Sequence, residues 1–322
     1  MKAILVYQHG GPDQLRYVDV PNPVPGKGQA LVKIRAIGVN FIDVYYRIGL
    51  YKAELPVSIG MEAAGIVEAI GPEVTEVNPG DRVAYAMCRG SYAEYALVPA
   101  SQLVKLPDEV DFATGAAAML QGMTAHYLTH STFPLKQGDT AVVHAAAGGV
   151  GLLLVQMAKM LGAKVLGTTS SERKAALARE AGADEVVLYD RQDFQQEVRR
   201  LTGGRGADVV YDSVGAATFL KSLDSLRPRG MMVSYGNASG AVPAIEPLLL
   251  SQKGSLFLTR PSLAHYCSTR EELLWRAGDV LGWIASGKLK ITIHRNYSLA
   301  EAAKAHAELE SRATSGKLLL IP

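Results

Sequence analysis

The chain has 322 residues, of which 48% are hydrophobic and 20% charged, a composition typical of globular proteins with a large core. Its 33 basic and 31 acidic residues leave a formal net charge of +2, which argues against charge-driven binding to nucleic acid or membrane. The length suggests two domains. No apolar segment approaches the ~18–20 residues that span a bilayer, and no signal peptide is visible. The two cysteines, Cys88 and Cys267, make no disulfide framework, so we expect a cytoplasmic protein.

The first hundred residues predict a β-rich domain. Short strand-like segments, separated by turns rich in proline and glycine, are expected at 3–6, 29–36, 64–70, 82–86 and 90–98. Many short strands at short spacing are typical of barrel-like β architectures.

The pattern changes near residue 110, where a helical segment, 113–129, begins an alternation of strands and helices. The expected strands are 142–145, 164–168, 185–188, 207–211 and 230–235, and the expected helices are 150–161, 172–181, 194–201 and 217–226. Strands separated by helices of this length predict an α/β fold with a doubly wound parallel sheet of the Rossmann type.

The last segment is expected to rejoin the first domain, with helices at 271–286 and 300–310 and strands at 290–294 and 317–321. We therefore assign residues 1–122 and 262–322 to a β-rich catalytic domain. Residues 123–261 form the expected dinucleotide-binding domain.

The most informative motif is His144-Ala-Ala-Ala-Gly-Gly-Val-Gly151, between the first expected strand of the parallel sheet and its helix. A helix N-terminus presents free backbone N–H groups and a positive dipole end, so this glycine turn suits a pyrophosphate. Gly148 and Gly149 let a ligand approach the backbone closely, and Gly151 allows tight packing of helix on strand. Ala146 replaces the first glycine of the G-x-G-x-x-G pattern, so the motif alone is weak.

The end of the next strand distinguishes NADH from NADPH. NAD sites carry an Asp or Glu there, roughly 20 residues beyond the glycines, which binds the ribose 2′-hydroxyl. Here the strand ends in Thr168-Thr-Ser-Ser171, followed by Arg173 and Lys174. Hydroxyls and bases accept a 2′-phosphate that a carboxylate would repel, so NADPH is expected. The alternatives are that Ser171 caps a helix beside solvated bases, and that Glu172 faces the ribose.

Several short motifs follow one another along the chain: Gly38-Val-Asn-Phe-Ile-Asp43, Gly60-Met-Glu-Ala-Ala-Gly65, Gly80-Asp-Arg-Val83, Leu120-Gln-Gly-Met-Thr-Ala125, the glycine turn, Tyr211-Asp-Ser-Val-Gly215, Tyr235-Gly-Asn237 and Ser255-Leu-Phe-Leu-Thr-Arg-Pro261. In their order and spacing, over its whole length, the chain resembles the zinc-independent quinone oxidoreductases of the medium-chain dehydrogenase/reductase superfamily, the zeta-crystallin group. The resemblance implies a Rossmann-type domain joined to a GroES-like, β-barrel-like catalytic domain.

Two substitutions argue against a catalytic metal. Zinc alcohol dehydrogenases of this superfamily carry a cysteine where this chain has Asn40 and a histidine where it has Met61. The structural-zinc lobe needs four closely spaced cysteines, and the segment near Cys88 holds one. None of the seven histidines has metal-ligand spacing, so we expect packing or surface roles for them. Without a Lewis acid, the acceptor must itself be electrophilic, such as a quinone or an α,β-unsaturated carbonyl.

The resemblance places four catalytic residues around the nicotinamide and the acceptor: Asn40, Asp43, Tyr45 and Tyr51. Asn40 is expected to donate an amide N–H to a quinone oxygen, and the tyrosines to stack on a flat ring or to offer a hydroxyl. The alternatives are that the tyrosines are ordinary loop aromatics and that Asp43 caps a helix starting at Val44.

The resemblance also implies three groups of NADPH-binding residues. Those at the pyrophosphate would be Gly148, Gly149 and Val150. Those around the 2′-phosphate would be Ser170, Lys174, Tyr189 and Arg312, although Tyr189 and Arg312 have ordinary structural and surface roles as alternatives. Those lining the nicotinamide half would be Thr124, Ser213, Asn237, Phe257 and Leu258.

We therefore expect an NADPH-dependent reductase of quinones, working by hydride or single-electron transfer without metal or flavin. An enone or enal reductase with the same cofactor and site is the alternative. An RNA-binding or crystallin-like structural protein is a third hypothesis, disfavoured by the low net charge and by the shortness of the basic runs Arg199-Arg200 and Arg227-Pro-Arg229. Residues 255–259 predict an unpaired edge strand that would pair across the two-fold axis of a homodimer.

Overall fold

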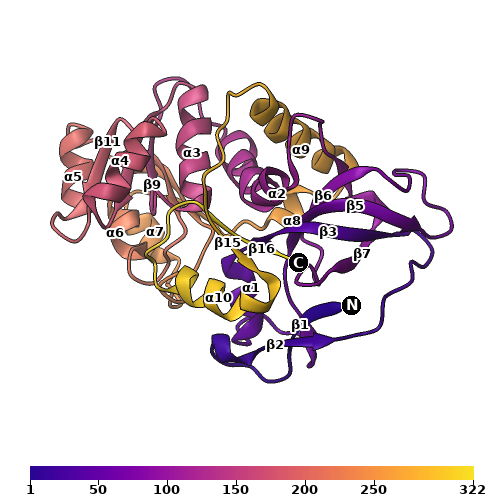
Figure 1. Cartoon of the computed structure of the whole chain (residues 1–322). Helices are drawn as coiled ribbons and strands as arrows, with labels where there is room; N and C mark the ends of the chain where they lie inside the picture. The colour runs from indigo at the N-terminus through magenta and orange to yellow at the C-terminus, as the bar shows by residue number, and fades with distance from the viewer. The chain divides into compact units, whose positions relative to one another are not determined.

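The computed structural model describes all residues, 1–322, and divides into two compact units (Figure 1). The first unit comprises Met1–Met123 and Cys267–Pro322, and the second comprises Thr124–Tyr266. Helix α2 (Phe112–Tyr127) contains the boundary between them. None of the helices has the length and apolar character that a membrane span requires.

The second unit is built on a six-stranded parallel sheet with the strand order β11-β10-β9-β12-β13-β14. Its strands are β9 (Thr140–Val143), β10 (Lys164–Thr169), β11 (Glu185–Leu188), β12 (Ala207–Asp212), β13 (Leu226–Ser234) and β14 (Phe257–Thr259). An order that grows outward in both directions from the first strand is that of doubly wound dinucleotide-binding folds. The predicted Rossmann-type sheet is thus confirmed.

Helices cover this sheet and explain why its central strands are buried throughout. They are α3 (Gly149–Met160), α4 (Glu172–Glu180), α5 (Phe194–Leu201), α6 (Phe219–Asp224), α7 (Leu248–Gln252) and α8 (Leu263–Tyr266). Helices α3 and α4 contact one another and β10, whereas α5 and α6 form a second contacting pair. Every residue of β9 and β12 is buried, as expected for parallel strands covered on both faces.

The first unit is β-rich. Its larger sheet has the order β15-β16-β3-β5-β6-β8, with β7 also paired to β3, and its smaller sheet has the order β2-β1-β4. The strands are β1 (Lys2–Val6), β2 (Leu15–Asp19), β3 (Gln29–Val39), β4 (Val57–Ser58), β5 (Glu62–Ile70), β6 (Arg82–Ala86), β7 (Tyr95–Pro99), β8 (Val104–Lys105), β15 (Ile293–Ser298) and β16 (Lys317–Ile321). The helices are α1 (Phe41–Arg47), α9 (Arg270–Ala285) and α10 (Ala302–Glu310).

The C-terminal strand pairs with a strand near the N-terminus of the chain. Strand β16 pairs antiparallel with β3, with Leu318 opposite Val39 and Leu320 opposite Ile37. Both strands contribute to one buried apolar cluster, which also takes in Leu299 of the tail. Burial of this cluster stabilises the attachment of the tail at roughly 25 cal/mol per Å² of apolar surface.

Several elements differ in their bounds from the sequence-based expectation; the strand expected at 290–294, for example, is β15, Ile293–Ser298. Strand β13 begins at Leu226, not at residue 230, because Leu226 pairs with Ala207 and Met231 with Val209, so that the proline- and glycine-containing segment between them bulges out. The strand expected over 90–98 is confined to β7, Tyr95–Pro99. Turns can be predicted locally, from proline, glycine and alternating polar residues. The register of a strand with a partner distant in sequence is not encoded by these local signals.

Candidate functional site

The glycine turn connects β9 to α3. Gly148 is the N-cap of α3, so the next backbone N–H groups have no carbonyl partner within the helix and are available to an anion. A Cβ on Gly151 would lie 2.2 Å from the Ala145 carbonyl oxygen and 2.9 Å from the Ala146 Cα. Gly151 therefore permits close packing of helix α3 on the turn residues Ala145 and Ala146, whereas the motif predicts close packing of the helix on the strand.

Ala146, which replaces the first glycine, is accommodated by a glycine on the neighbouring strand. The Ala146 side chain is fully buried, and its N–H donates to the Thr168 carbonyl at 3.1 Å. A Cβ added to Gly167 would lie only 2.9 Å from the Ala146 Cβ. Gly167 thus provides the space that the alanine methyl needs, a compensation that the linear motif does not reveal.

Three of the predicted 2′-phosphate residues lie near the carboxyl ends of adjacent strands. Thr169 of β10 pairs with Leu188 of β11, so Ser170 and Tyr189 continue these two strands side by side. The Tyr189 N–H donates to the Thr169 carbonyl at 3.1 Å. Lys174 lies in the first turn of α4, where burial and the neighbouring Arg173 charge lower the pKa of its ammonium group.

The sequence left two alternatives open for this segment: that Ser171 caps a helix, and that Glu172 faces the ribose. The first of them is correct. Ser171 is the N-cap of α4, and its hydroxyl accepts the Lys174 backbone N–H at 3.4 Å. Glu172 forms an ion pair with Arg179 of the same helix at 3.8 Å, with 63% of its side chain exposed. Arg312 belongs to the other unit, where it follows α10 with a positive φ of 57°.

The predicted nicotinamide residues come from several elements of the second unit. Ser213 directly follows β12, and a Cβ on Gly236 would lie 2.5 Å from its carbonyl oxygen, so the segments containing Ser213 and Asn237 are in contact. Thr124 is buried on α2. Phe257 and Leu258 lie on β14 and are 57% and 37% exposed.

Of the residues predicted to lie at the acceptor, Asn40 and Asp43 begin helix α1. The Asp43 Oδ2 accepts the Asn40 backbone N–H at 2.8 Å, an interaction of the capping-box type. The capping alternative for Asp43 is therefore only partly correct: its carboxylate accepts the N–H of the N-cap residue, but the N-cap is Asn40 and the helix starts at Phe41, not at Val44. Both side chains are at least 96% buried, with exposed fractions of 4% for Asn40 and 0% for Asp43.

The amide group of Asn40 has no hydrogen left for an acceptor. Its Nδ2 donates to the Gly38 carbonyl at 3.1 Å and to Glu62 Oε2 at 2.9 Å. An amide nitrogen carries two hydrogens, so both are used. The expectation that Asn40 donates to a quinone oxygen is not met in this structure, because the buried Glu62 carboxylate competes for that donor.

The tyrosines of this region form one aromatic group. The rings of Tyr45 and Tyr51 lie 5.3 Å apart in an edge-on arrangement, and Tyr46 contacts Tyr51 at 5.7 Å. The Tyr51 N–H donates to the Tyr45 carbonyl at 3.1 Å, which holds the two residues together. The structure thus brings Tyr45 and Tyr51 together, with Tyr45 buried and Tyr51 partly exposed.

A chain of buried polar groups leads away from Asp43. Arg47 Nη1 lies 2.9 Å from His306 Nδ1, and His306 Nε2 lies 2.9 Å from the Tyr92 hydroxyl, which donates to Asp43 Oδ2 at 3.1 Å. Burial and the Arg47 charge lower the pKa of His306 to about 3, so its ring is neutral. Because arginine only donates, His306 Nδ1 accepts and Nε2 carries the hydrogen. The Glu310 carboxylate completes the chain at 2.8 Å from Arg47.

The geometry of this chain makes Asp43 the final acceptor of a directed series of hydrogen bonds. Burial raises the pKa of its carboxyl to about 7, even though the Asn40 N–H opposes the shift. Its Oδ1 is buried with no hydrogen-bond partner. Sequence reasoning missed Tyr92 and His306, because a lone histidine on a C-terminal helix carries no local signal of its partners.

No group of three His, Cys, Asp or Glu residues is placed to hold a metal ion. Both cysteines are free, and burial raises the pKa of each thiol to about 11, which disfavours a reactive thiolate. His144, next to the glycine turn, lies 2.8 Å from the Thr168 hydroxyl and 2.9 Å from that of Ser222. This histidine therefore packs and hydrogen-bonds inside the sheet.

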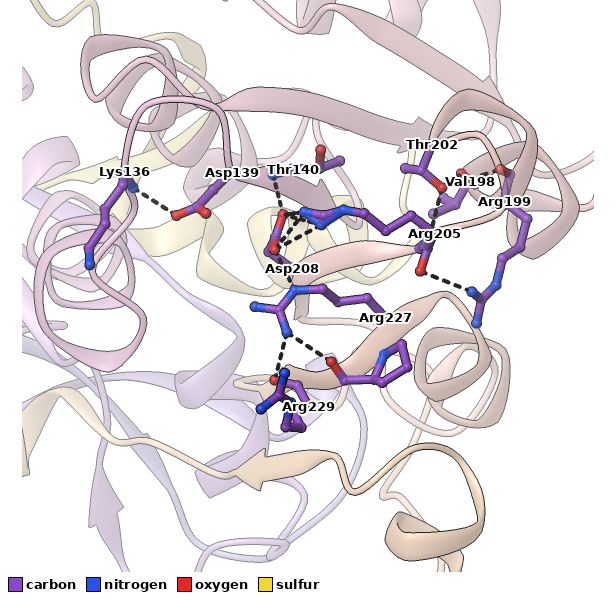
Figure 2. A network of polar contacts seen from close by, with 12 residues as sticks. Lys136, Asp139, Thr140, Val198, Arg199, Thr202, Arg205, Asp208, Arg227 and Arg229 are labelled. Atoms are coloured by element: carbon purple, nitrogen blue, oxygen red, sulfur yellow. Dashed lines mark hydrogen bonds and ion pairs between the residues drawn. The ribbon is translucent and has the colours of Figure 1, made fainter.

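The basic runs of the second unit are largely used within the fold. Figure 2 shows Arg205 and Arg227 converging on the buried Asp208, at 2.6 Å and 2.5 Å. The same carboxylate accepts the Thr140 N–H at 2.8 Å, which ties the start of β9 to β12. Arg199 donates to the carbonyl oxygens of Asp224 and its neighbours. These guanidinium groups stabilise strand ends and are not a free cationic surface.

Two family models match the chain. The model described as "Alcohol dehydrogenase GroES-like domain" matches residues 26–108, which confirms the predicted GroES-like character of the β-rich part. The model described as "Zinc-binding dehydrogenase" matches residues 149–272. The residues present do not fit a zinc ion, because Asn40 and Met61 stand at the ligand positions and no cluster of ligands replaces them.

Known proteins resemble the chain over its full length. A quinone oxidoreductase of Pseudomonas aeruginosa is 48% identical, covering 100% of this chain and 99% of that protein. A 2-haloacrylate reductase of a Burkholderia species is 43% identical, covering 99% and 98%. The crystal structure of Escherichia coli quinone oxidoreductase complexed with NADPH superposes with a TM-score of 0.98 at 44% identity, covering 100% of both chains.

Proposed function

Because the chain belongs to the zinc-independent quinone oxidoreductases of the medium-chain dehydrogenase/reductase superfamily, it catalyses NADPH-dependent reduction of quinones, and we propose which residues do so. The observation that carries the assignment of the cofactor site is the edge formed by Ser170, Lys174 and Tyr189. No carboxylate ends β10, so this edge suits a 2′-phosphate.

Each part of the site has a proposed role. Bound NADPH supplies the hydride, and the α3 N-terminus at Gly148, Gly149 and Val150 binds its pyrophosphate. Ser213 and Asn237 line the nicotinamide half. Tyr45 and Tyr51 orient a flat acceptor by ring contact. We predict that the first unit binds the acceptor and the second unit binds the cofactor. We also predict that Arg312 contacts the 2′-phosphate.

An assay of NADPH and NADH oxidation with a panel of quinones, enones and 2-haloacrylate tests this function. We expect kcat/KM with quinones to be at least about tenfold higher for NADPH than for NADH. The reason is that NADH lacks the charged 2′-phosphate that the site would bind. An NADH preference, or oxidation of neither cofactor with any quinone, would contradict the proposal.

Reduction of an activated carbon–carbon double bond is the second candidate. The similarity to a 2-haloacrylate reductase favours it, because hydride delivery to a β-carbon requires the same cofactor geometry. If kcat/KM for 2-haloacrylate or an enal exceeds that for every quinone, this candidate replaces quinones as the preferred acceptor class.

An RNA-binding or structural role is disfavoured by the internal use of Arg199, Arg205 and Arg227. A cytoplasmic location stays a prediction, and the two free cysteines fit a reducing compartment. Cell fractionation that placed the activity outside the cytoplasm would contradict it.

We propose that the protein is a homodimer formed through β14. This strand pairs only with β13, so its other edge presents unpaired N–H and C=O groups, and Phe257 is 57% exposed. Two such edges related by a two-fold axis would form one continuous sheet. Sedimentation equilibrium at micromolar concentration should give twice the mass of one chain, and a monomer there would contradict the proposal.

A further inference from the structure

A buried lysine lies beside Asn40. Because Leu318 of β16 is opposite Val39 of β3, the preceding residue, Lys317, lies next to Asn40 at the end of the paired strands. Its Nζ is 2.7 Å from Asn40 Oδ1 and 2.5 Å from Glu62 Oε2. Lys317 is 2% exposed and Glu62 is fully buried. Lysine and glutamate are rarely buried so deeply unless their charges are paired.

These contacts leave the Asn40 amide in a single orientation. Its oxygen faces the Lys317 ammonium, which only donates, and its nitrogen faces Glu62 Oε2 and the Gly38 carbonyl, which only accept. Rotating the amide by 180° would place donor against donor and acceptor against acceptor. The other Glu62 oxygen accepts the Leu120 N–H at 2.5 Å, so the carboxylate is held as well.

Close packing reinforces this orientation. A Cβ on Gly38 would lie 2.2 Å from Glu62 Oε2, 2.5 Å from the Ala116 carbonyl and 2.7 Å from Lys317 Cε. No side chain other than hydrogen fits there without displacing the ion pair. The glycine at position 38 therefore leaves the space in which Lys317, Glu62 and Asn40 contact one another.

We infer that Lys317 is a positioning residue for quinone reduction, which acts by fixing the Asn40 amide and thereby the start of helix α1 that carries Tyr45. The inference rests on the proposed acceptor-side role of Tyr45. Asn40 is the N-cap residue of α1, and its backbone N–H donates to Asp43 Oδ2 while its carbonyl accepts the Asp43 N–H at 3.0 Å. Holding the Asn40 side chain therefore also holds the residue from which the helix starts. The C-terminal strand, distant in sequence, thus becomes part of the acceptor side.

The first test replaces Lys317 with methionine, which keeps most of the stem and removes the ammonium group. In the full-length enzyme, Lys317→Met should lower kcat for a quinone by about 10- to 100-fold, because small misplacements of a site have effects of this size. The NADPH Kd, from quenching of protein fluorescence, should change less than about twofold. Lys304→Met removes an exposed lysine paired with Glu301 on the same C-terminal segment and should change neither quantity. An unchanged kcat in Lys317→Met would overturn the inference.

A double variant separates positioning from mere charge neutralisation. Lys317→Met leaves the Glu62 carboxylate buried without a cation, so this variant should have a lower Tm than the wild type. Adding Glu62→Gln removes the buried charge and should recover most of the lost Tm. If Lys317 positions Asn40, kcat stays low in the double variant, and full recovery of kcat together with Tm would overturn the inference. If Lys317→Met alone does not fold, the double variant still provides the test.

Asn40→Ala distinguishes failure of the inference from failure of the proposed site. If Asn40→Ala leaves kcat/KM for the quinone unchanged, the proposed role of the α1 segment and Tyr45 at the acceptor is wrong. If Asn40→Ala lowers it and Lys317→Met does not, only the role of Lys317 is wrong. If both are right, Lys317→Met has no further effect in the Asn40→Ala background, because the two residues act as one unit.

Discussion

Replacing Lys174 with glutamate should lower kcat/KM for NADPH by about 100-fold while leaving kcat/KM for NADH within about threefold of the wild-type value. Lys174 is half-buried in the first turn of α4, beside Ser170. A carboxylate there would face the 2′-phosphate across a short distance, and at an effective dielectric constant of ~20 a pair of charges ~4 Å apart interacts by about 4 kcal/mol. Partial exposure reduces this interaction to about 2.7 kcal/mol, which corresponds to the expected 100-fold loss. Steady-state kinetics with both cofactors and one quinone measures the ratio.

The matched control reverses a charge in the last turn of a different helix, α5. Arg200 lies there with 67% of its side chain exposed and pairs with Glu197, so Arg200→Glu makes the same change in net charge without touching α4. It should leave the NADPH-to-NADH ratio unchanged within about twofold. If Lys174→Glu also leaves that ratio unchanged, the 2′-phosphate is bound elsewhere and the assignment of Lys174 is wrong.

Adding a single methyl group at Gly151 should weaken NADPH binding by more than about 30-fold and destabilise the protein by about 2–3 kcal/mol. The added Cβ would lie 2.2 Å from the Ala145 carbonyl oxygen, a backbone atom that cannot rotate away. The turn or the helix must therefore shift, and with it the N–H groups aimed at the pyrophosphate. Isothermal titration with NADPH and thermal unfolding measure the two effects.

Gly282→Ala is the matched control for Gly151→Ala. Gly282 is also helical, in α9, but an added Cβ there meets no atom within 4 Å. Alanine favours helix over glycine by about 1 kcal/mol, so Gly282→Ala should leave stability equal or higher and NADPH binding unchanged. Equal behaviour of the two variants would show that the close approach at Gly151 has no role in cofactor binding.

The sequence by itself determined the architecture of the second unit and the choice of NADPH. Strand β11, helix α5 and strand β16 have the bounds that the local pattern predicts. Apolar runs, helical spacing and glycine turns act over a few residues, so each element is encoded where it stands. The absence of a carboxylate at the end of β10 is equally local, and the glycine turn needs only its neighbours to be interpreted.

Only the tertiary structure decided which residues distant in sequence contact Asn40 and Tyr92. Lys317 meets Asn40 across 277 positions of sequence because β16 pairs with β3, and His306 reaches Tyr92 across 214 positions. No pattern among neighbouring residues predicts either contact. The register of paired strands and the packing of the core determine which groups a buried charge or ring nitrogen contacts. The same physics corrected the expected role of Asn40, whose amide hydrogens are taken by Glu62 and a carbonyl group before any acceptor arrives. Sequence thus identified the hydride donor, whereas the fold determined which polar groups near the start of α1 already have hydrogen-bond partners.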